Sequence, residues 1–219
     1  MDSKDELGRA YWNIVAHKYD LTMAVFGGPI PSMVELTTDG LCGADRVLEV
    51  AAGTGLVTVA LARIAKSVIA TDYAPQMVEM LRDKLQARDI TNVECQVVDL
   101  YELPFPPASF DAVVAANVLH LVPDERAALA SLRLALRPGG KLIVPTYCHG
   151  ETWTARSISR MLAVTGFPGR RRFTLSSLRE TVRTSGFEIV QSALLPGILP
   201  IGYVEASAQR DLGALSSAR

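Results

Sequence analysis

The stretch Val47-Leu48-Glu49-Val50-Ala51-Ala52-Gly53-Thr54-Gly55-Leu56-Val57-Thr58 decides the fold of this chain. Its first half is an apolar run typical of a buried strand, and two glycines then lead into an apolar segment of helical character. Glycine allows a sharp turn and lets a ligand approach the backbone closely. The N-terminus of a helix favours a carboxylate or a phosphate. The stretch therefore predicts a binding turn for a polar ligand, with a turn that serves packing alone as the alternative.

Length and composition favour a soluble α/β protein made of one domain, residues 1–219. The chain has 219 residues, of which 49% are hydrophobic and 21% charged, which is enough to bury a core. The net charge of −1 gives no broad electrostatic footprint for nucleic acid or an anionic membrane. Arg170-Arg171-Arg172 is a local exception, which fits a solvated turn or contact with an anionic acceptor or lipid headgroup. We therefore expect a small-molecule partner and no nucleic acid.

Targeting and metal-binding patterns are absent from the sequence. No apolar run approaches the roughly 20 residues of a membrane span, and the N-terminus has no apolar signal segment. Cys42, Cys95 and Cys148 are scattered and form no Cys-x-x-Cys pair, so neither a disulfide framework nor a zinc site is indicated. We expect a cytoplasmic protein with no integral membrane segment and no metal, either a monomer or a homodimer.

Apolar runs alternate with segments of helical period along most of the chain. The runs are continuous, as in strands covered on both faces, and they span Val47–Ala51, Ser67–Thr71, Val93–Val98, Phe110–Ala116 and Lys141–Pro145. Helices are predicted over Pro75–Arg88 and over Asp124–Arg137, where Pro138-Gly139-Gly140 is a stop signal. The alternation predicts a parallel sheet with helices on both faces.

The two ends of the chain depart from this alternation. A helix over Thr174–Ser185 is followed by strands Phe187–Leu195 and Ile201–Ala208, which the short connection predicts to be an antiparallel hairpin. Residues 1–30 are expected to form an N-terminal helical cap, and residues 149–173 a partly helical insertion over the active site. The predicted fold is thus Rossmann-like and doubly wound, with a mostly parallel seven-stranded sheet and a C-terminal antiparallel hairpin.

Polar residues follow three of the predicted strands where each strand ends. Asp72 ends the second run, Asp99 ends the third, and Asn117 follows the fourth. An acid at the position of Asp72 can accept hydrogen bonds from both hydroxyls of a ribose, and Asp99 can receive the amino edge of an adenine. Each acid alone could equally be a cap or a loop residue. Parallel strands place their carboxyl ends on one edge, so the ordered set predicts one crevice.

Together these motifs resemble the class I S-adenosylmethionine-dependent methyltransferases, especially the small-molecule branch that includes the ubiquinone and menaquinone methyltransferases. The resemblance covers about residues 10–208 and is carried by 47–55, Thr71–Met77, Asp99-Leu100, Phe110–Val114 and Leu136–Gly140. Ala51-Ala52 departs from the family, which often has Gly or Cys there. The resemblance implies a Rossmann-like fold and methyl transfer from S-adenosylmethionine, with S-adenosylhomocysteine as the product.

Carried over residue by residue, the resemblance also implies a cofactor site. Gly53 and Gly55 would line the methionine portion, Asp72 would bind the ribose, and Asp99 would hold the adenine edge. Glu49 resembles the acid that organises the turn. The implied cofactor-binding residues are Tyr19, Glu49, Ala51, Gly53, Thr54, Gly55, Asp72, Tyr73, Met77, Asp99, Leu100 and Asn117.

The methyl acceptor is expected to be a small apolar or aromatic molecule or a thiol. In-line attack on an activated methyl group needs mostly positioning, and a base only where the acceptor loses a proton. His120 and His149 follow the fourth and fifth strands and are the candidate catalytic bases, with a structural role as the alternative for each. Tyr11, Tyr147 and Trp153 are the candidate acceptor-pocket residues, although such aromatics are often core.

Several other functions compete with this interpretation. A phospholipid or a quinone precursor is an alternative acceptor, and a scaffold subunit that binds S-adenosylmethionine is the non-enzyme alternative. A nicotinamide-dependent oxidoreductase is disfavoured because position 58 is Thr58 where the third glycine of G-x-G-x-x-G would stand. Nucleic-acid methylation is disfavoured by the charge and by the absence of an Asn/Asp-Pro-Pro-Tyr/Phe signature after the fourth strand.

Overall fold

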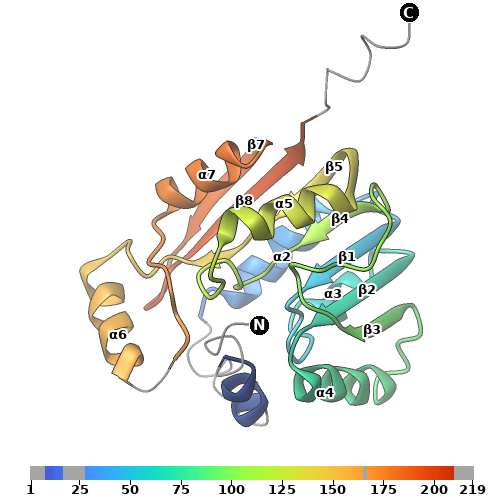
Figure 1. Ribbon diagram of the computed structural model, residues 1–219, viewed down its shortest axis with the longest axis horizontal. Helices are drawn as coiled ribbons and strands as arrows, with labels where there is room; N and C mark the ends of the chain where they lie inside the picture. The colour runs from blue at the N-terminus through green and yellow to red at the C-terminus, as the bar shows by residue number, and fades with distance from the viewer. Residues whose placement is uncertain (1–7, 17–27, 165–166, 210–219) are drawn as a thin grey trace, which may run out of the picture.

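Eight strands form one mixed sheet in the computed structural model, which describes residues 8–16, 28–164 and 167–209 (Figure 1). The strands are β1 (Arg46–Val50), β2 (Ser67–Asp72), β3 (Val93–Val97), β4 (Phe110–Val114), β5 (Leu136–Ile143), β6 (Thr146–Tyr147), β7 (Phe187–Leu195) and β8 (Ile201–Ala208). The first five are parallel in the order β3-β2-β1-β4-β5. β8 is antiparallel to β5, β6 and β7. The expected sheet with its C-terminal hairpin is confirmed.

The short strand β6 continues the line of β5. Lys141 lies opposite Ser207 and Tyr147 lies opposite Ile201 in one unbroken antiparallel register with β8. The interruption falls at Pro145, which has no N–H to donate to the ladder. The sheet therefore has the width of seven strands, as predicted, although eight are assigned.

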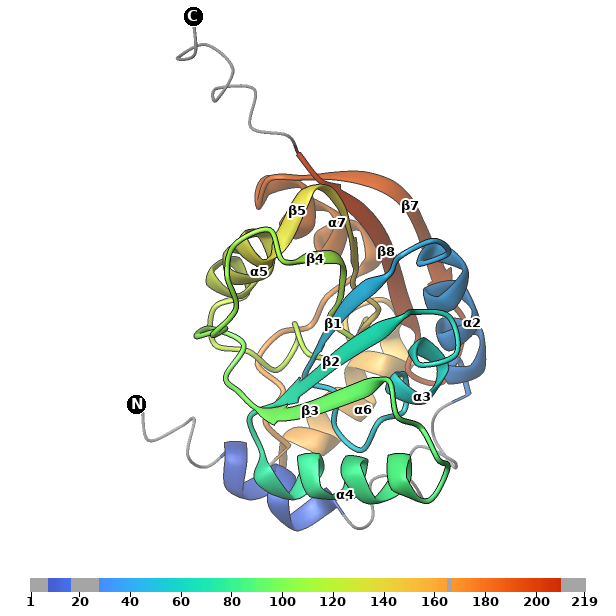
Figure 2. The ribbon, with the colours of Figure 1, turned by 90° about the vertical axis from the view of Figure 1, so that its right-hand side faces the viewer.

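Helices cover both faces of the sheet. They are α2 (Ile30–Gly40), α3 (Thr58–Leu61), α4 (Pro75–Gln86), α5 (Glu125–Ala135), α6 (Trp153–Val164) and α7 (Leu175–Thr184), and residues 8–16 are also helical. α5 and α7 lie on one face, and α2 and α3 lie on the other (Figure 2). Leu48 packs into the first layer and Val47 into the second. Because both faces are covered, the central strands are continuously apolar.

The predicted helix starts are confirmed where side chains cap them. The Asp124 carboxylate accepts hydrogen bonds from the backbone N–H groups of Arg126 and Ala127 at the start of α5. Thr174 begins α7 in a capping box with Ser177. These caps supply acceptors for N–H groups that have no partner within the helix.

Two local predictions differ from the structure, and one helix was not predicted. The helix after the glycine turn, α3, has only four residues, so its dipole is too small to support the predicted attraction for an anion. The helix α5 ends at Ala135, and β5 begins at Leu136, so Pro138-Gly139-Gly140 lies in a bulged strand instead of ending the helix. The helix α2 was not predicted. None of the helices in the described ranges combines the length and apolar character of a membrane span.

Candidate active site

The two glycines of the turn after β1 have different roles. Both have a positive φ, +55° at Gly53 and +85° at Gly55, which favours glycine at either position. A Cβ atom added to Gly53 would meet nothing within 4 Å, whereas one added to Gly55 would collide with Leu81 of α4. Gly53 therefore leaves open space beside the backbone, and Gly55 allows the turn to pack closely on α4.

Asp72 ties this turn to the end of β2. Its carboxylate accepts a hydrogen bond of 2.9 Å from the backbone N–H of Gly53 and another of 2.9 Å from that of Ala74. The side chain is buried, and burial raises the pKa of Asp72 to about 6, although the backbone hydrogen bonds act in the opposite direction. The aspartate thus shapes the turn and remains a strong acceptor for a further donor.

One cavity gathers most of the residues predicted to bind the cofactor. They come from the ends of four neighbouring parallel strands and are Ala51, Gly53, Asp72, Tyr73, Met77, Asp99, Leu100 and Asn117. Asp99 is oriented by a hydrogen bond of 3.0 Å that the backbone N–H of Tyr101 donates to its carboxylate. The carboxyl ends of the parallel strands therefore converge on one crevice, as the topology requires.

The remaining predicted cofactor residues lie elsewhere. Glu49, Thr54 and Gly55 are buried and do not line this cavity, and Tyr19 lies outside the described residues. Burial raises the pKa of Glu49 to about 8, while the nearby Thr58 hydroxyl lowers it and Asp72 raises it further. The Glu49 Oε2 atom has no hydrogen-bond partner, so this acid sits behind the turn.

Sequence reasoning missed much of the cavity wall. The missed lining residues come from the helical residues 8–16, from the segments that follow β3 and β4 and from the segment after α6: Gly8, Arg9, Trp12, Val98, Tyr101, Val118, Leu121, Val122, Pro123, Pro168 and Arg170. They belong to segments that have no contact pattern in the sequence. Arg170 belongs to the basic run, and its backbone N–H donates to the carbonyl of His120 at 2.9 Å.

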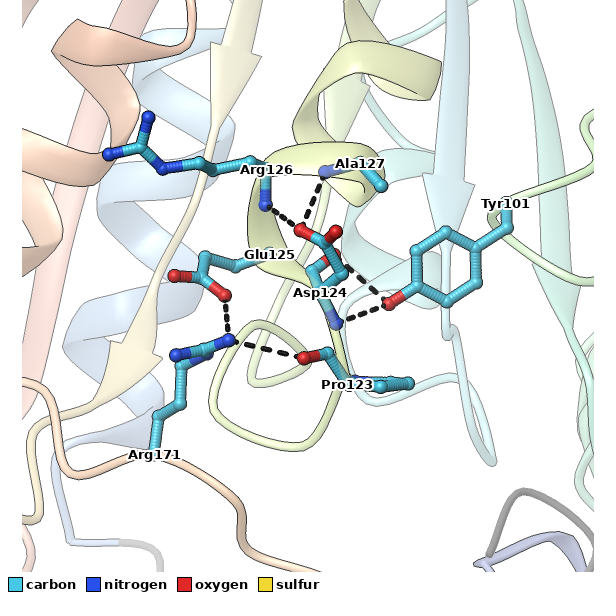
Figure 3. A network of polar contacts seen from close by, with 7 residues as sticks. All are labelled: Tyr101, Pro123, Asp124, Glu125, Arg126, Ala127 and Arg171. Carbon is cyan, nitrogen blue, oxygen red and sulfur yellow. Dashed lines mark hydrogen bonds and ion pairs between the residues drawn. The ribbon is translucent and has the colours of Figure 1, made fainter. Parts of the chain in front are cut away.

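A network of polar contacts holds the rim of the cavity together (Figure 3). The Tyr101 hydroxyl donates to the Asp124 carbonyl and accepts from the Asp124 N–H, both at 3.0 Å. Arg171 pairs with Glu125 and donates to the carbonyl of Pro123 at 3.1 Å. The backbone N–H of Arg171 also donates to the carbonyl of His120 at 3.1 Å. The network fastens the segment after α6 to the start of α5.

His120 and His149 form a buried pair next to this cavity. They are 2% and 3% exposed, and their ring centroids lie 5.3 Å apart. Within the described residues, neither nitrogen of His149 has a hydrogen-bond partner, and Nδ1 of His120 also has none. Burial lowers the pKa of His120 to about 3 and that of His149 to about 4, with the other histidine contributing at His120 and Arg172 at His149. Both rings are therefore neutral near pH 7.

Aromatic rings surround the histidine pair and connect it to the cavity. The Phe167 ring lies 6.2 Å from the His120 ring and 6.3 Å from the Trp12 ring, and Trp12 lines the cavity. Tyr147 lies 5.9 Å from His120. Tyr11 packs edge-on against Trp12 at 5.2 Å. Two of the three predicted acceptor-pocket residues thus belong to this aromatic cluster.

Trp153, the third predicted acceptor-pocket residue, does not join this aromatic cluster in the part of the chain that the structure describes. It is the first residue of α6 and is 74% exposed, so it faces solvent. The helix buries only Ala155, and the sequence alone did not show which side of the helix faces the protein.

Two observations of the structure indicate that the residues of the cavity fit S-adenosylmethionine. Open space beside Gly53 leaves room for a ligand against the backbone, and Asn117, which lines the cavity, has a buried Oδ1 atom with no partner. Asp72 and Asp99 supply carboxylates at the ends of adjacent strands. No group of three His, Cys, Asp or Glu side chains that could hold a metal occurs among the residues that the structure describes.

Comparisons with known proteins agree with this geometry. A family model described as a methyltransferase domain matches residues 48–144. The ubiquinone/menaquinone biosynthesis C-methyltransferase UbiE of Teredinibacter turnerae is 36% identical over 148 residues, which are 64% of this chain and 59% of the relative. The corresponding protein of a Marinomonas species is 33% identical over 158 residues, 69% of this chain and 63% of the relative.

Solved structures show the same fold. A SAM-dependent methyltransferase of Thermotoga maritima, described as a possible histamine N-methyltransferase, superposes with a TM-score of 0.72 at 20% identity, over 90% of this chain and 98% of that one.

The chain spans about three fifths of the length of the two curated relatives. S-adenosylmethionine is the methyl donor of the family to which the matched residues point. The match, the fold and the strand-end cavity together make the chain similar to the class I S-adenosylmethionine-dependent methyltransferases.

Proposed function

We propose that the chain transfers a methyl group from S-adenosylmethionine to a ring carbon of a small hydroxylated aromatic molecule, of the quinol type. The observation that carries the proposal is that Gly53, Asp72 and Asp99 line one cavity from three strand ends. The curated relatives, which are named as C-methyltransferases of ubiquinone and menaquinone biosynthesis, support the class of acceptor.

The cofactor would be held mainly by groups that the backbone already orients. Asp72 accepts from two backbone N–H groups, and each of its oxygens has a further lone pair for a ribose hydroxyl. Asp99 would receive the adenine amino group, between Tyr73, Met77 and Leu100. Asn117, whose Oδ1 has no partner, would accept from the ammonium group of the methionine end.

When bound, the cofactor supplies a methyl group that is already activated by a positively charged sulfur. The chain therefore has to hold the acceptor carbon in line with that group and exclude water. Alignment of this kind can contribute on the order of 7–11 kcal/mol to the lowering of the barrier. Trp12 and Phe167 would hold the acceptor ring by packing, since aromatic faces bind flat rings at little entropic cost.

His120 and His149 would accept the hydrogen bond of the acceptor hydroxyl. Both are neutral near pH 7, and both have buried nitrogens with no partner. A weak base suffices here, because the hydroxyl becomes strongly acidic as the ring carbon gives an electron pair to the methyl group. The hydroxyl proton passes to an imidazole nitrogen. The proton on the methylated carbon then leaves to water while the imidazolium returns a proton to the oxygen, which restores both the aromatic ring and the neutral histidine.

The first experiment measures cofactor binding by titration calorimetry with S-adenosylhomocysteine. We expect saturable binding of one molecule per chain, and no heat from the folded protein would overturn the proposed site. Asp83→Ala, on the exposed side of α4, is the matched control for the variant Asp72→Ala, and we expect it to keep the wild-type affinity for S-adenosylhomocysteine.

The second experiment identifies the acceptor by transfer of a radiolabelled methyl group. Reduced quinols, phenols, thiols, amines and phospholipids are compared, and we expect the label on a ring carbon of the quinols. Transfer to thiols or phospholipids alone would replace the proposed acceptor. Binding of S-adenosylhomocysteine with no transfer to any acceptor would indicate a binding subunit instead of an enzyme.

A further inference from the structure

The helix α6 exposes apolar side chains of the kind that helices usually turn toward a core. Trp153, Met161 and Val164 are 74%, 65% and 88% exposed. Met161 and Val164 follow Trp153 by eight and eleven residues, a spacing that places all three side chains on one side of the helix. The opposite side carries Ala155, the one residue that α6 buries. An exposed apolar stripe of this size indicates a binding partner.

The sequence that contains and follows α6 is rich in positive charge. From Thr152 to Arg179 the sequence contains six arginines and no aspartate or glutamate, in a chain whose net charge is −1. Arg171 forms an ion pair with Glu125, and the Arg172 guanidinium donates a hydrogen bond of 3.2 Å to the Ser159 hydroxyl.

Two arginines of α6 itself remain available for a partner. Arg156 and Arg160 are exposed, and neither guanidinium has a partner among the residues that the structure describes. Both fall on the outward side of α6, next to the apolar stripe, by the helical period. We define the α6 face as Trp153, Arg156, Arg160, Met161 and Val164.

We propose that the α6 face binds the surface of an anionic lipid bilayer. A helix with a tryptophan and aliphatic side chains on one side and flanking arginines lies in the plane of a membrane interface. The apolar side chains enter the boundary of the acyl region, while the arginines reach anionic headgroups. Figure 1 shows α6 at the edge of the molecule, apart from the sheet, where a flat surface can reach it.

A second copy of this chain fits the α6 face less well than a bilayer does. A twofold dimer through this face would place the same patch on both sides, so arginines would oppose arginines. Like charges across an interface are strongly unfavourable. An anionic bilayer instead complements both the apolar stripe and the positive charge.

The position of α6 in the chain links this surface to the proposed acceptor site. The helix lies between His149, which is in the buried pair, and Phe167, Pro168 and Arg170, which contact the pair or line the cavity. A bilayer contact through α6 would bring an apolar acceptor close to this end of the cavity. The binding surface is independent of the proposed reaction, because lipid binding can be measured without turnover.

Sedimentation with vesicles tests the inference on the full chain. The vesicles contain phosphatidylcholine alone or with about 30 mol% phosphatidylglycerol, which supplies the negative surface potential. We expect binding to the anionic vesicles, weaker binding at high salt, and a blue shift of Trp153 fluorescence that Trp153→Phe removes. Arg156→Gln/Arg160→Gln should weaken binding by about fivefold per arginine.

Matched substitutions test whether vesicle binding requires the α6 face or only exposed apolar side chains anywhere on the surface. Trp153→Gln/Met161→Gln/Val164→Gln should lose most vesicle binding, whereas Val190→Gln/Ile198→Gln, at positions 62% and 66% exposed outside α6, should keep it. Circular dichroism and thermal melting confirm that each variant is folded. Equal binding by the triple variant, equal binding to neutral vesicles, or a dimer that the triple variant abolishes without any vesicle binding would each overturn the inference.

Discussion

The two halves of the candidate site hold one buried polar side chain each in opposite ways. On the cofactor side, both oxygens of Asp72 accept hydrogen bonds from backbone N–H groups of the turn. On the acceptor side, neither nitrogen of His149 has a partner among the described residues, although the ring is 3% exposed. A buried polar group without a partner destabilises the folded state. Folding alone therefore satisfies the Asp72 carboxylate, whereas the His149 nitrogens are left for a partner that the described residues do not supply.

The largest expected effect is on turnover in the acceptor half. His149→Phe and His120→Phe should each lower the rate of methyl transfer by about a hundredfold or more, since proton acceptance contributes that much. Affinity for S-adenosylhomocysteine should stay within a factor of about two, because neither ring lines the cofactor cavity. Rate measurements on purified variants with saturating cofactor test this prediction.

The free energy of unfolding of His149→Phe and the rate of the conservative variant His149→Gln test the same prediction further. Because the unpartnered nitrogens are removed, the free energy of unfolding of His149→Phe should stay the same or rise. His149→Gln, which keeps an acceptor atom, should recover part of the rate. If both phenylalanine variants keep the wild-type rate, the histidines are structural and positioning alone drives the reaction.

The next largest effect is on cofactor affinity. Asp72→Ala should weaken binding of S-adenosylhomocysteine by at least about tenfold, because it removes a charged acceptor. It should also lower the free energy of unfolding by about 1–3 kcal/mol, since the N–H groups of Gly53 and Ala74 lose their partner. Calorimetry and urea unfolding measure the two quantities. A variant with full affinity would contradict the ribose role, and one that is not destabilised would contradict the shaping of the turn.

The two halves should respond to pH with opposite signs. The pKa values of His120 and His149 in the folded protein, about 3 and 4, lie below the ordinary value of 6.5. The unfolded chain therefore binds more protons, and stability falls as the pH drops below about 6.5, by roughly 1 kcal/mol for each histidine near pH 5.5. The pKa of Asp72 is raised to about 6, so its contribution to stability falls as the pH rises from 3.8 toward 6.

Urea unfolding at pH 7.5 and 5.5 separates these contributions. His120→Phe/His149→Phe should lose less stability on acidification than the wild type does. Asp72→Ala should lose more, because it lacks the group that gains a proton in the folded state. Parallel pH profiles for the wild type and both variants would show that these groups do not titrate as their surroundings require.

The smallest expected effect concerns the rim that joins the two halves. Tyr101→Phe removes the hydroxyl that exchanges hydrogen bonds with Asp124, as Figure 3 shows. We expect a loss of stability of about 0.5–1.5 kcal/mol and a small rise in KM for the acceptor, with cofactor affinity unchanged. Thermal melting and steady-state kinetics measure these changes, with Ser109→Ala, away from the cavity, as the control. A larger loss of cofactor affinity would place Tyr101 in the binding site itself.

The sequence predicted the strands and the convergence of their polar ends because these features are local. Continuous apolar runs marked β1 to β5, and Asp124 and Thr174 marked the starts of α5 and α7 through caps that involve neighbouring residues. Asp72 and Asp99 follow strands directly, so parallel pairing was enough to bring them together. Trp12, Phe167 and Arg170 were not predicted, because they come together only when distant segments pack.

By itself, the sequence determined the order of most strands and helices, the edge where the strand ends meet, and the resemblance to a methyltransferase family. These follow from hydrophobic periodicity, caps and turns, which act over a few residues. Only the tertiary structure decided that Gly53 leaves open space while Gly55 packs on Leu81, that Trp153 faces outward, and that His149 is buried without a partner. Burial and hydrogen-bond partners depend on residues far away in the chain, and no local pattern in the sequence records them.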